Sequence, residues 1–190
     1  DQQPGPFTAE AWVKVAAVSA GAQGIINRDF RDGSREALSW KLGLDSDGQT
    51  LVLDVFTDDA NYESVVSSKP LVEDQWHHVA GVFDGTDLIV YVDGTKTGEQ
   101  PLGASSWHNT DALLRIGTDP CCISERDFNG DIDQVRIWKT ALTETQIRAR
   151  MHQTIAPEEA VFDDLIASYR FDAGTGTTAY NYAGPNDAAF

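Results

Sequence analysis

Segments in which apolar and polar residues alternate recur through the first 140 residues of the chain. Because successive side chains of a strand point to opposite faces, this period of two predicts β-strands. Gly, Asp, Asn and Pro bound the segments, at spacings typical of an antiparallel all-β domain. We expect strands at residues 7–15, 37–44, 50–56, 76–83, 87–92, 112–117 and 131–138.

Local signals predict one turn type and one helix. Residues 45–48 read Asp-Ser-Asp-Gly and predict a hairpin between two strands. A helix of two to three turns is expected after the last strand, in ALTETQIRARM. Thr143 and Gln146 there have the spacing of a capping box, while Leu142 and Ile147 occupy the positions of a hydrophobic staple.

The sequence changes character after the predicted helix. Residues 154–164 combine a proline with several acids, which is typical of a linker or an exposed connection. A further strand is expected in LIASYRF, and the residues after it are rich in Gly, Thr and Asn. We therefore place one domain at residues 1–156 and a linker with an additional strand at residues 157–190.

Composition narrows the class of protein. The 190 residues, 41% of them hydrophobic, suffice for one sizeable domain, and no apolar run is long enough for membrane insertion. Fourteen basic and thirty acidic residues give a formal net charge of −16, so electrostatics would oppose binding to nucleic acid. The N-terminal DQQPGPF lacks the basic and apolar stretches of a signal peptide, and we interpret the chain as a mature or excised piece.

Four stretches follow one another in a recognisable order: FTAEAWVK at 7–14, the hairpin at 45–48, QWHHVAGVFDGTDLIVYVDGTKTG at 75–98, and LLRIG followed by FNGDIDQVRIWKTALTETQI at 128–147. Together they resemble the laminin-G-like, concanavalin-A-like jelly-roll family, including its pentraxin relatives. The resemblance implies a two-sheet antiparallel β-sandwich with one short helix after the last family strand. The segment that usually opens a family member lies here at residues 169–190. It either begins the next repeat of a tandem array or supplies a strand that completes this sandwich.

The resemblance also implies a function: a non-catalytic carbohydrate-binding module of a larger secreted or cell-surface protein. Glucanases with the same fold need two carboxylates about 5 Å apart. The comparable strand offers Asp131 and Asp133 without a glutamate, so we do not expect an enzyme. The alternative is a structural or protein–protein adhesion module that docks neighbouring domains. A pocket at the end loops would favour glycan binding, and a flat surface would favour protein contact.

Calcium is the cofactor that the resemblance suggests, because acidic loops supply the oxygen ligands that this ion prefers. In pentraxin-like members a calcium site lies between the last two family strands, helped by an earlier loop; the corresponding loops here are residues 118–129 and 27–36. A separate structural ion is common near the GDID strand, although Asp133 could instead accept hydrogen bonds from strand-end N–H groups. The candidate metal ligands are Asp119, Asp127, Asp131 and Asp133.

A glycan site needs an exposed aromatic plane and planar polar side chains. Trp107 lies in the polar stretch GASSWHNTD and is the predicted platform. The other tryptophans alternate with apolar neighbours and are expected in the core: Trp12, Trp40, Trp76 and Trp138. Arginines gather in the two loops, where they either bind ligand or pair with neighbouring acids. The candidate ligand-binding residues are Arg31, Asp32, Arg35, Trp107, Cys121, Cys122, Glu125 and Arg126.

The chain has two cysteines, and they are adjacent: Cys121 and Cys122. Their Cα atoms are about 3.8 Å apart, below the roughly 4.4–6.8 Å of most disulfides, so a bond between them would be strained. Strain of this kind is typical of binding loops. The alternatives are two free thiols or intermolecular bridges. Because free thiols would not persist in a secreted protein, we favour a vicinal disulfide that forms a rigid apolar part of the binding surface.

Overall fold

The computed structural model describes residues 5–16, 21–32, 35–56, 62–103, 113–119, 127–155, 163–184 and 188–189, with the side chains of 29–38 and 188–189 outside that description. The strands are β1 (Phe7–Val15), β2 (Gln23–Asp32), β3 (Arg35–Leu44), β4 (Leu51–Phe56), β5 (Tyr62–Val66), β6 (Trp76–Phe83), β7 (Asp87–Val92), β8 (Thr95–Pro101), β9 (Leu113–Ile116), β10 (Gly130–Trp138), β11 (Leu165–Tyr169), β12 (Thr178–Ala179) and β13 (Ala188–Ala189). The helix is α1 (Glu144–Arg150).

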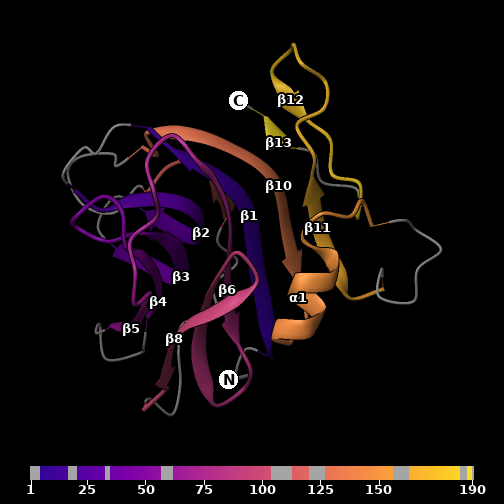
Figure 1. The fold of residues 1–190 in the computed structure, drawn as a ribbon. Helices are drawn as coiled ribbons and strands as arrows, with labels where there is room; N and C mark the ends of the chain where they lie inside the picture. Colours follow the sequence, from indigo (N-terminus) through magenta and orange to yellow (C-terminus); the bar gives the residue numbers. More distant parts are fainter. Residues whose placement is uncertain are drawn as a thin grey trace.

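Two antiparallel sheets form a jelly-roll sandwich, which confirms the predicted fold class (Figure 1). One sheet has six strands in the order β11-β10-β1-β6-β7-β8, and the other has five in the order β5-β4-β3-β2-β9. The central strand β1 pairs with both β6 and β10. Trp12 therefore lies opposite His78 on one side and Asp133 on the other, a register that later defines the candidate site.

The main core lies between the two sheets and is built from inward-facing aliphatic side chains. Val13 and Val79 of the six-stranded sheet belong to the same buried cluster as Leu42 and Leu53 of the five-stranded sheet. A Cβ atom at Gly81 would lie 3.0 Å from Leu42 Cδ1 and 3.1 Å from a Leu53 methyl group, so the sheets approach closely there. Full burial of each such side chain stabilises the fold by about 1.5–3 kcal/mol.

A second apolar cluster lies on the outer face of the six-stranded sheet, where α1 covers it (Figure 1). Trp138 of β10 packs there with Leu142 and Ile147. The predicted capping box is confirmed, because Thr143 Oγ1 accepts from Gln146 N at 3.3 Å and Gln146 Oε1 accepts from Thr143 N at 2.8 Å. The helix therefore begins where its N-terminal N–H groups are satisfied and its apolar side meets the sheet.

The strand β11 extends the six-stranded sheet at its edge. It pairs antiparallel with β10, with Ser168 opposite Arg136. The chain then returns along β11, where Tyr182 N donates to Ser168 O at 2.9 Å. Residues 165–169 are thus part of this sandwich, whereas the start of a further repeat after residue 156 stays a prediction.

Residues 27–36 were predicted as a loop, but residues 27–32 and 35–36 belong to the paired strands β2 and β3, so that prediction was wrong. Asn27 lies opposite Lys41, and Asp32 lies opposite Arg35 at the end of the hairpin. Antiparallel pairing satisfies the backbone groups of charged residues as well as apolar ones, which explains a strand without apolar alternation. The hairpin at residues 45–48 is confirmed, because Gly48 has φ 72° and donates to Asp45 O at 2.8 Å.

Candidate functional site

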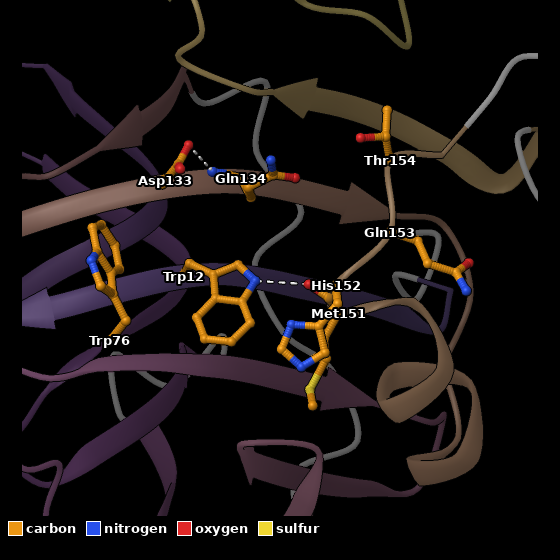
Figure 2. A pocket seen from close by; sticks show the side chains of 8 residues that line it. All are labelled: Trp12, Trp76, Asp133, Gln134, Met151, His152, Gln153 and Thr154. Carbon is orange, nitrogen blue, oxygen red and sulfur yellow. Dashed lines mark hydrogen bonds between the residues drawn. The ribbon is translucent and has the colours of Figure 1, made fainter.

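A pocket of about 400 Å³ opens on the outer face of the six-stranded sheet, beside the C-terminal end of α1 (Figure 2). Three strands form its floor, and the segment that follows the helix forms its wall. The wall crosses β1 where the helix no longer covers the sheet. The residues that line the pocket are Trp12, Trp76, Asp133, Gln134, Met151, His152, Gln153 and Thr154.

Trp12 lies in the middle of the floor, and its indole is held in place. Its Nε1 donates to Met151 O at 2.7 Å, so the ring is fixed to the wall (Figure 2). The His152 ring lies 5.1 Å from the Trp12 ring, measured between centroids, and the His78 ring meets it edge-on at 5.5 Å. A ring restrained on several sides loses little conformational entropy when a ligand binds.

Trp76 is 45% exposed, so its predicted place in the core was wrong. As the first residue of β6 it lies beyond the part of the sheet that α1 covers. Trp12 is also on the outer face, whereas Trp40 and Trp138 are buried as predicted. The parity of the sequence could have shown this for Trp12, because it shares a strand face with the polar Glu10 and Lys14.

A β-bulge brings two neighbouring polar side chains to the pocket. Glu10 pairs with Arg136 and Trp12 with Asp133, so one residue of β1 lies opposite two residues of β10. Gln134 has φ 52° within this bulge, a conformation that is uncommon outside glycine. Asp133 and Gln134 consequently both line the pocket, although regular alternation would send them to opposite faces.

The Asp133 carboxylate is half-buried and accepts a hydrogen bond from Gln134 N at 2.7 Å (Figure 2). Burial raises the pKa of this carboxyl group, the Gln134 N–H opposes the rise, and the negative charge of Asp172 adds to it, leaving the pKa above its ordinary value. The pocket therefore holds a carboxylate whose charge is only weakly compensated by the protein.

Buried charges below the pocket hold its wall in place. The Arg136 guanidinium donates to Arg150 O at 3.1 Å, to Gln153 O at 2.6 Å and to Glu10 Oε1 at 3.3 Å. Trp138 Nε1 donates to the same Glu10 oxygen at 3.0 Å. Charge-assisted hydrogen bonds to backbone carbonyls thus fix the last residue of α1 and the segment that follows it.

Glu10 is fully buried, and His78 Nε2 lies 3.3 Å from its second oxygen. Burial raises the pKa of Glu10, but the adjacent His78, the charge of Arg136 and the hydrogen bond from Trp138 together lower it below its ordinary value. The carboxylate is therefore stabilised in its charged form inside the protein.

The predicted metal ligands lie in four different environments. Asp133 lines the pocket, Asp127 is exposed, and Asp131 binds Lys14 Nζ at 2.7 Å. Asp119 is fully buried, with its carboxylate 3.3 Å from Lys41 Nζ. Across the described ranges, no three His, Cys, Asp or Glu side chains gather in a way that could hold a metal ion.

The predicted ligand-binding residues are not tested by the structure. Arg31, Asp32 and Arg35 lie at the end of the β2–β3 hairpin, and their side chains are outside the description. The remaining residues of that prediction also fall outside the described ranges: Trp107, Cys121, Cys122, Glu125 and Arg126. The vicinal disulfide between the two cysteines therefore stays a prediction.

Comparison of the sequence with family models identifies the superfamily to which this sandwich belongs. A laminin G family model, described as the concanavalin A-like lectin/glucanases superfamily, matches residues 1–148. The chain belongs to this superfamily. A search of curated proteins found no significant match to this chain.

Solved structures share the superfamily fold with this chain. A protein of Bacteroides ovatus with a proposed role in carbohydrate binding superposes with a TM-score of 0.73 at 23% identity, covering 96% of this chain and 51% of its own. Domain 4 of the extracellular arabinanase AbnA from Geobacillus stearothermophilus, solved with arabinotriose, gives a TM-score of 0.59 at 18% identity, covering 78% of this chain and 67% of its own.

The binding domain of botulinum neurotoxin serotype D gives a TM-score of 0.53 at 18% identity, covering 76% of this chain and 35% of its own. Several structural neighbours of this superfamily member are thus binding domains. The chain spans about half the length of the Bacteroides ovatus protein. Within the described residues, no helix has the length and apolar character needed to cross a membrane.

Proposed function

We propose that the protein is a non-catalytic, extracellular carbohydrate-binding module that holds a glycan in the pocket between Trp12 and Trp76. The observation that carries this proposal is the exposed indole of Trp76 beside a second, fixed indole in one pocket. Sugars present apolar C–H faces to aromatic rings and hydroxyl groups to planar polar groups. Gln134 and Gln153 supply such amides at the same pocket.

The structural neighbours support the same class of ligand. The Bacteroides ovatus protein has a proposed role in carbohydrate binding, and the arabinanase domain was solved with an arabinose oligosaccharide. The arabinanase is extracellular, and the domain similar to this chain is one part of it. This supports an extracellular module attached to a larger protein.

A glycan array followed by titration calorimetry tests the proposal. We expect Trp76→Ala to raise the dissociation constant for the best glycan at least about tenfold, because it removes an aromatic face worth on the order of 1.4 kcal/mol. Tyr62→Ala is the matched control, since Tyr62 is 63% exposed but lies on β5 of the other sheet. Absence of any glycan whose binding depends on Trp76 would overturn the proposal.

Calcium is a separate part of the proposal. Asp127 is an exposed carboxylate just before β10, where a hard cation would find oxygen ligands. An ion that binds only the folded protein must raise its melting temperature. We therefore expect EDTA to lower the Tm and calcium to restore it; an unchanged Tm would exclude a structural ion.

A further inference from the structure

Asp131 and Asp133 are two residues apart on β10 but have different partners on the neighbouring strand. Asp131 lies opposite Lys14 and binds its ammonium group at 2.7 Å. Asp133 lies opposite Trp12, so an indole stands where Lys14 stands in the first pair. Among the described residues, no lysine, arginine or histidine forms an ion pair with Asp133, and the hydrogen bond it accepts comes from Gln134 N.

The Lys14 ammonium shows how a cation is held at this sheet. It lies over the Trp76 ring, 5.8 Å from its centroid, while it binds the Asp131 carboxylate. A carboxylate and an indole thus share one ammonium group at the edge of the pocket. Cation–π attraction and a charge-assisted hydrogen bond act together in this arrangement. Trp12 and Asp133 are direct neighbours across β1 and β10, and both line the pocket, so a carboxylate and an indole also meet there, without a cation of the protein between them.

We propose that the ligand carries a protonated amine, bound between the Asp133 carboxylate and the Trp12 indole, so that the pocket takes a glycan with free amino sugars. This inference rests on the proposed function and names its ligand class. No lysine or arginine lines the pocket, and the charge of Lys14 at its edge is already paired with Asp131. The formal net charge of −16 also favours the approach of a cationic ligand over an anionic one.

The charge of Asp172 supports the same ligand. Burial is the main cause that raises the pKa of Asp133, and the charge of Asp172 adds to it, so two like charges oppose each other in the absence of ligand. An ammonium group beside Asp133 would relieve this repulsion and lower that pKa. A neutral hydroxyl at the same place would leave the repulsion in place.

Three β-1,4-linked tetrasaccharides test the inference, because they differ only in the group at carbon 2: glucosamine, N-acetylglucosamine and glucose. Titration calorimetry at low salt should give a dissociation constant about tenfold lower for the glucosamine tetramer than for the other two. The difference should shrink as salt is added. Asp133→Asn should remove the preference for the amine, so that the dissociation constants of the glucosamine and glucose tetramers become similar.

Asp131→Asn is the matched control, because Asp131 already has its cation in Lys14 and should not contribute to the preference. Equal binding of the three tetramers, a preference that survives Asp133→Asn, or binding of none of them would overturn the inference. The proposed function fails separately, if the glycan array shows no glycan whose binding depends on Trp76. The two failures are therefore distinguishable.

Discussion

Both sheets carry a buried cluster of charges on the face that points away from the main core, but the two clusters are built in opposite ways. On the six-stranded sheet, the Glu10 carboxylate is surrounded by Arg136, His78 and Trp138. On the five-stranded sheet, Lys41 Nζ lies between two carboxylates, 2.9 Å from Asp54 and 3.3 Å from Asp119. One acid shares several donors in the first cluster, and one base serves two acids in the second.

The difference shows what each cluster holds in place. The Glu10 cluster orients Arg136, which in turn binds the carbonyl groups of the pocket wall. The Lys41 cluster holds the chain that leaves β9: a Cβ atom at Gly24 would lie 2.4 Å from Thr118 O, so that backbone passes directly over β2. The first cluster thus ties the end of α1 and the segment after it to a sheet, and the second ties down the segment after β9.

The largest effect is expected from Lys41→Met. It leaves two nearly inaccessible carboxylates facing each other without their shared cation. Breaking a buried ion pair from one side costs about 3–5 kcal/mol, and we expect the free energy of unfolding to fall by that amount in urea denaturation. Lys96→Met is the control, because Lys96 pairs with Glu99 on the surface and should change stability little. Equal stability of the two variants would show that the Lys41 cluster does not stabilise the fold.

Arg136→Met should destabilise the protein less, by about 3 kcal/mol, because Trp138 and His78 still face the buried Glu10 carboxylate. It should also weaken glycan binding, since the carbonyl groups of Arg150 and Gln153 lose their donor and the pocket wall loosens. Chemical denaturation and calorimetry measure the two effects. A variant that is destabilised but binds glycan normally would show that the cluster does not position the pocket.

The two clusters should respond to opposite changes of pH. The pKa of Glu10 is lowered, so its contribution to stability is complete above the ordinary value of 4.5 and is lost as the pH falls through the folded pKa. Burial lowers the pKa of Lys41, but Asp54 and Asp119 outweigh burial and raise it. Its contribution is therefore complete below 10.5 and is lost as the pH rises through the folded pKa.

Unfolding free energies measured across pH would separate the two clusters. Glu10→Gln should flatten the acid side of the profile, and Lys41→Met the alkaline side. If Glu10→Gln leaves the acid side unchanged, other carboxylates control acid unfolding.

Alternation in the sequence predicted several of the strands, because successive side chains of a strand point to opposite faces, but it missed β2, β5 and β8. The segments at 7–15, 76–83 and 87–92 coincide with β1, β6 and β7. The capping box was equally local, since Thr143 and Gln146 are three residues apart. Strand order and register needed the structure, because pairing partners such as Trp12 and Asp133 are distant in sequence.

The pocket was harder to predict because it depends on a break in the alternation. The bulge at Gln134 places two consecutive side chains on one face. Gln134 has a positive φ, and the sequence GDIDQVRIW has no glycine or asparagine at that position that would indicate it. The exposure of Trp76 likewise depends on where α1 stops covering the sheet. Asp119 was predicted as a metal ligand by position, and its burial beside Lys41 could not be read from a sequence separation of 78 residues.

The smallest effect is expected from Thr143→Ala, which removes the N-cap of α1. Loss of this cap should lower the free energy of unfolding by about 1 kcal/mol, because solvent can replace its hydrogen bond to Gln146 N. Thr143→Ser keeps the hydroxyl group and should be close to the wild type. The pocket wall follows α1 directly, and Arg136 binds the wall through Gln153 O. Comparing how much Thr143→Ala and Arg136→Met weaken glycan binding therefore decides which of the two fixes the wall. If Thr143→Ala weakens glycan binding as much as Arg136→Met does, the wall depends on the helix; if only Arg136→Met does so, it depends on the buried charges of the six-stranded sheet.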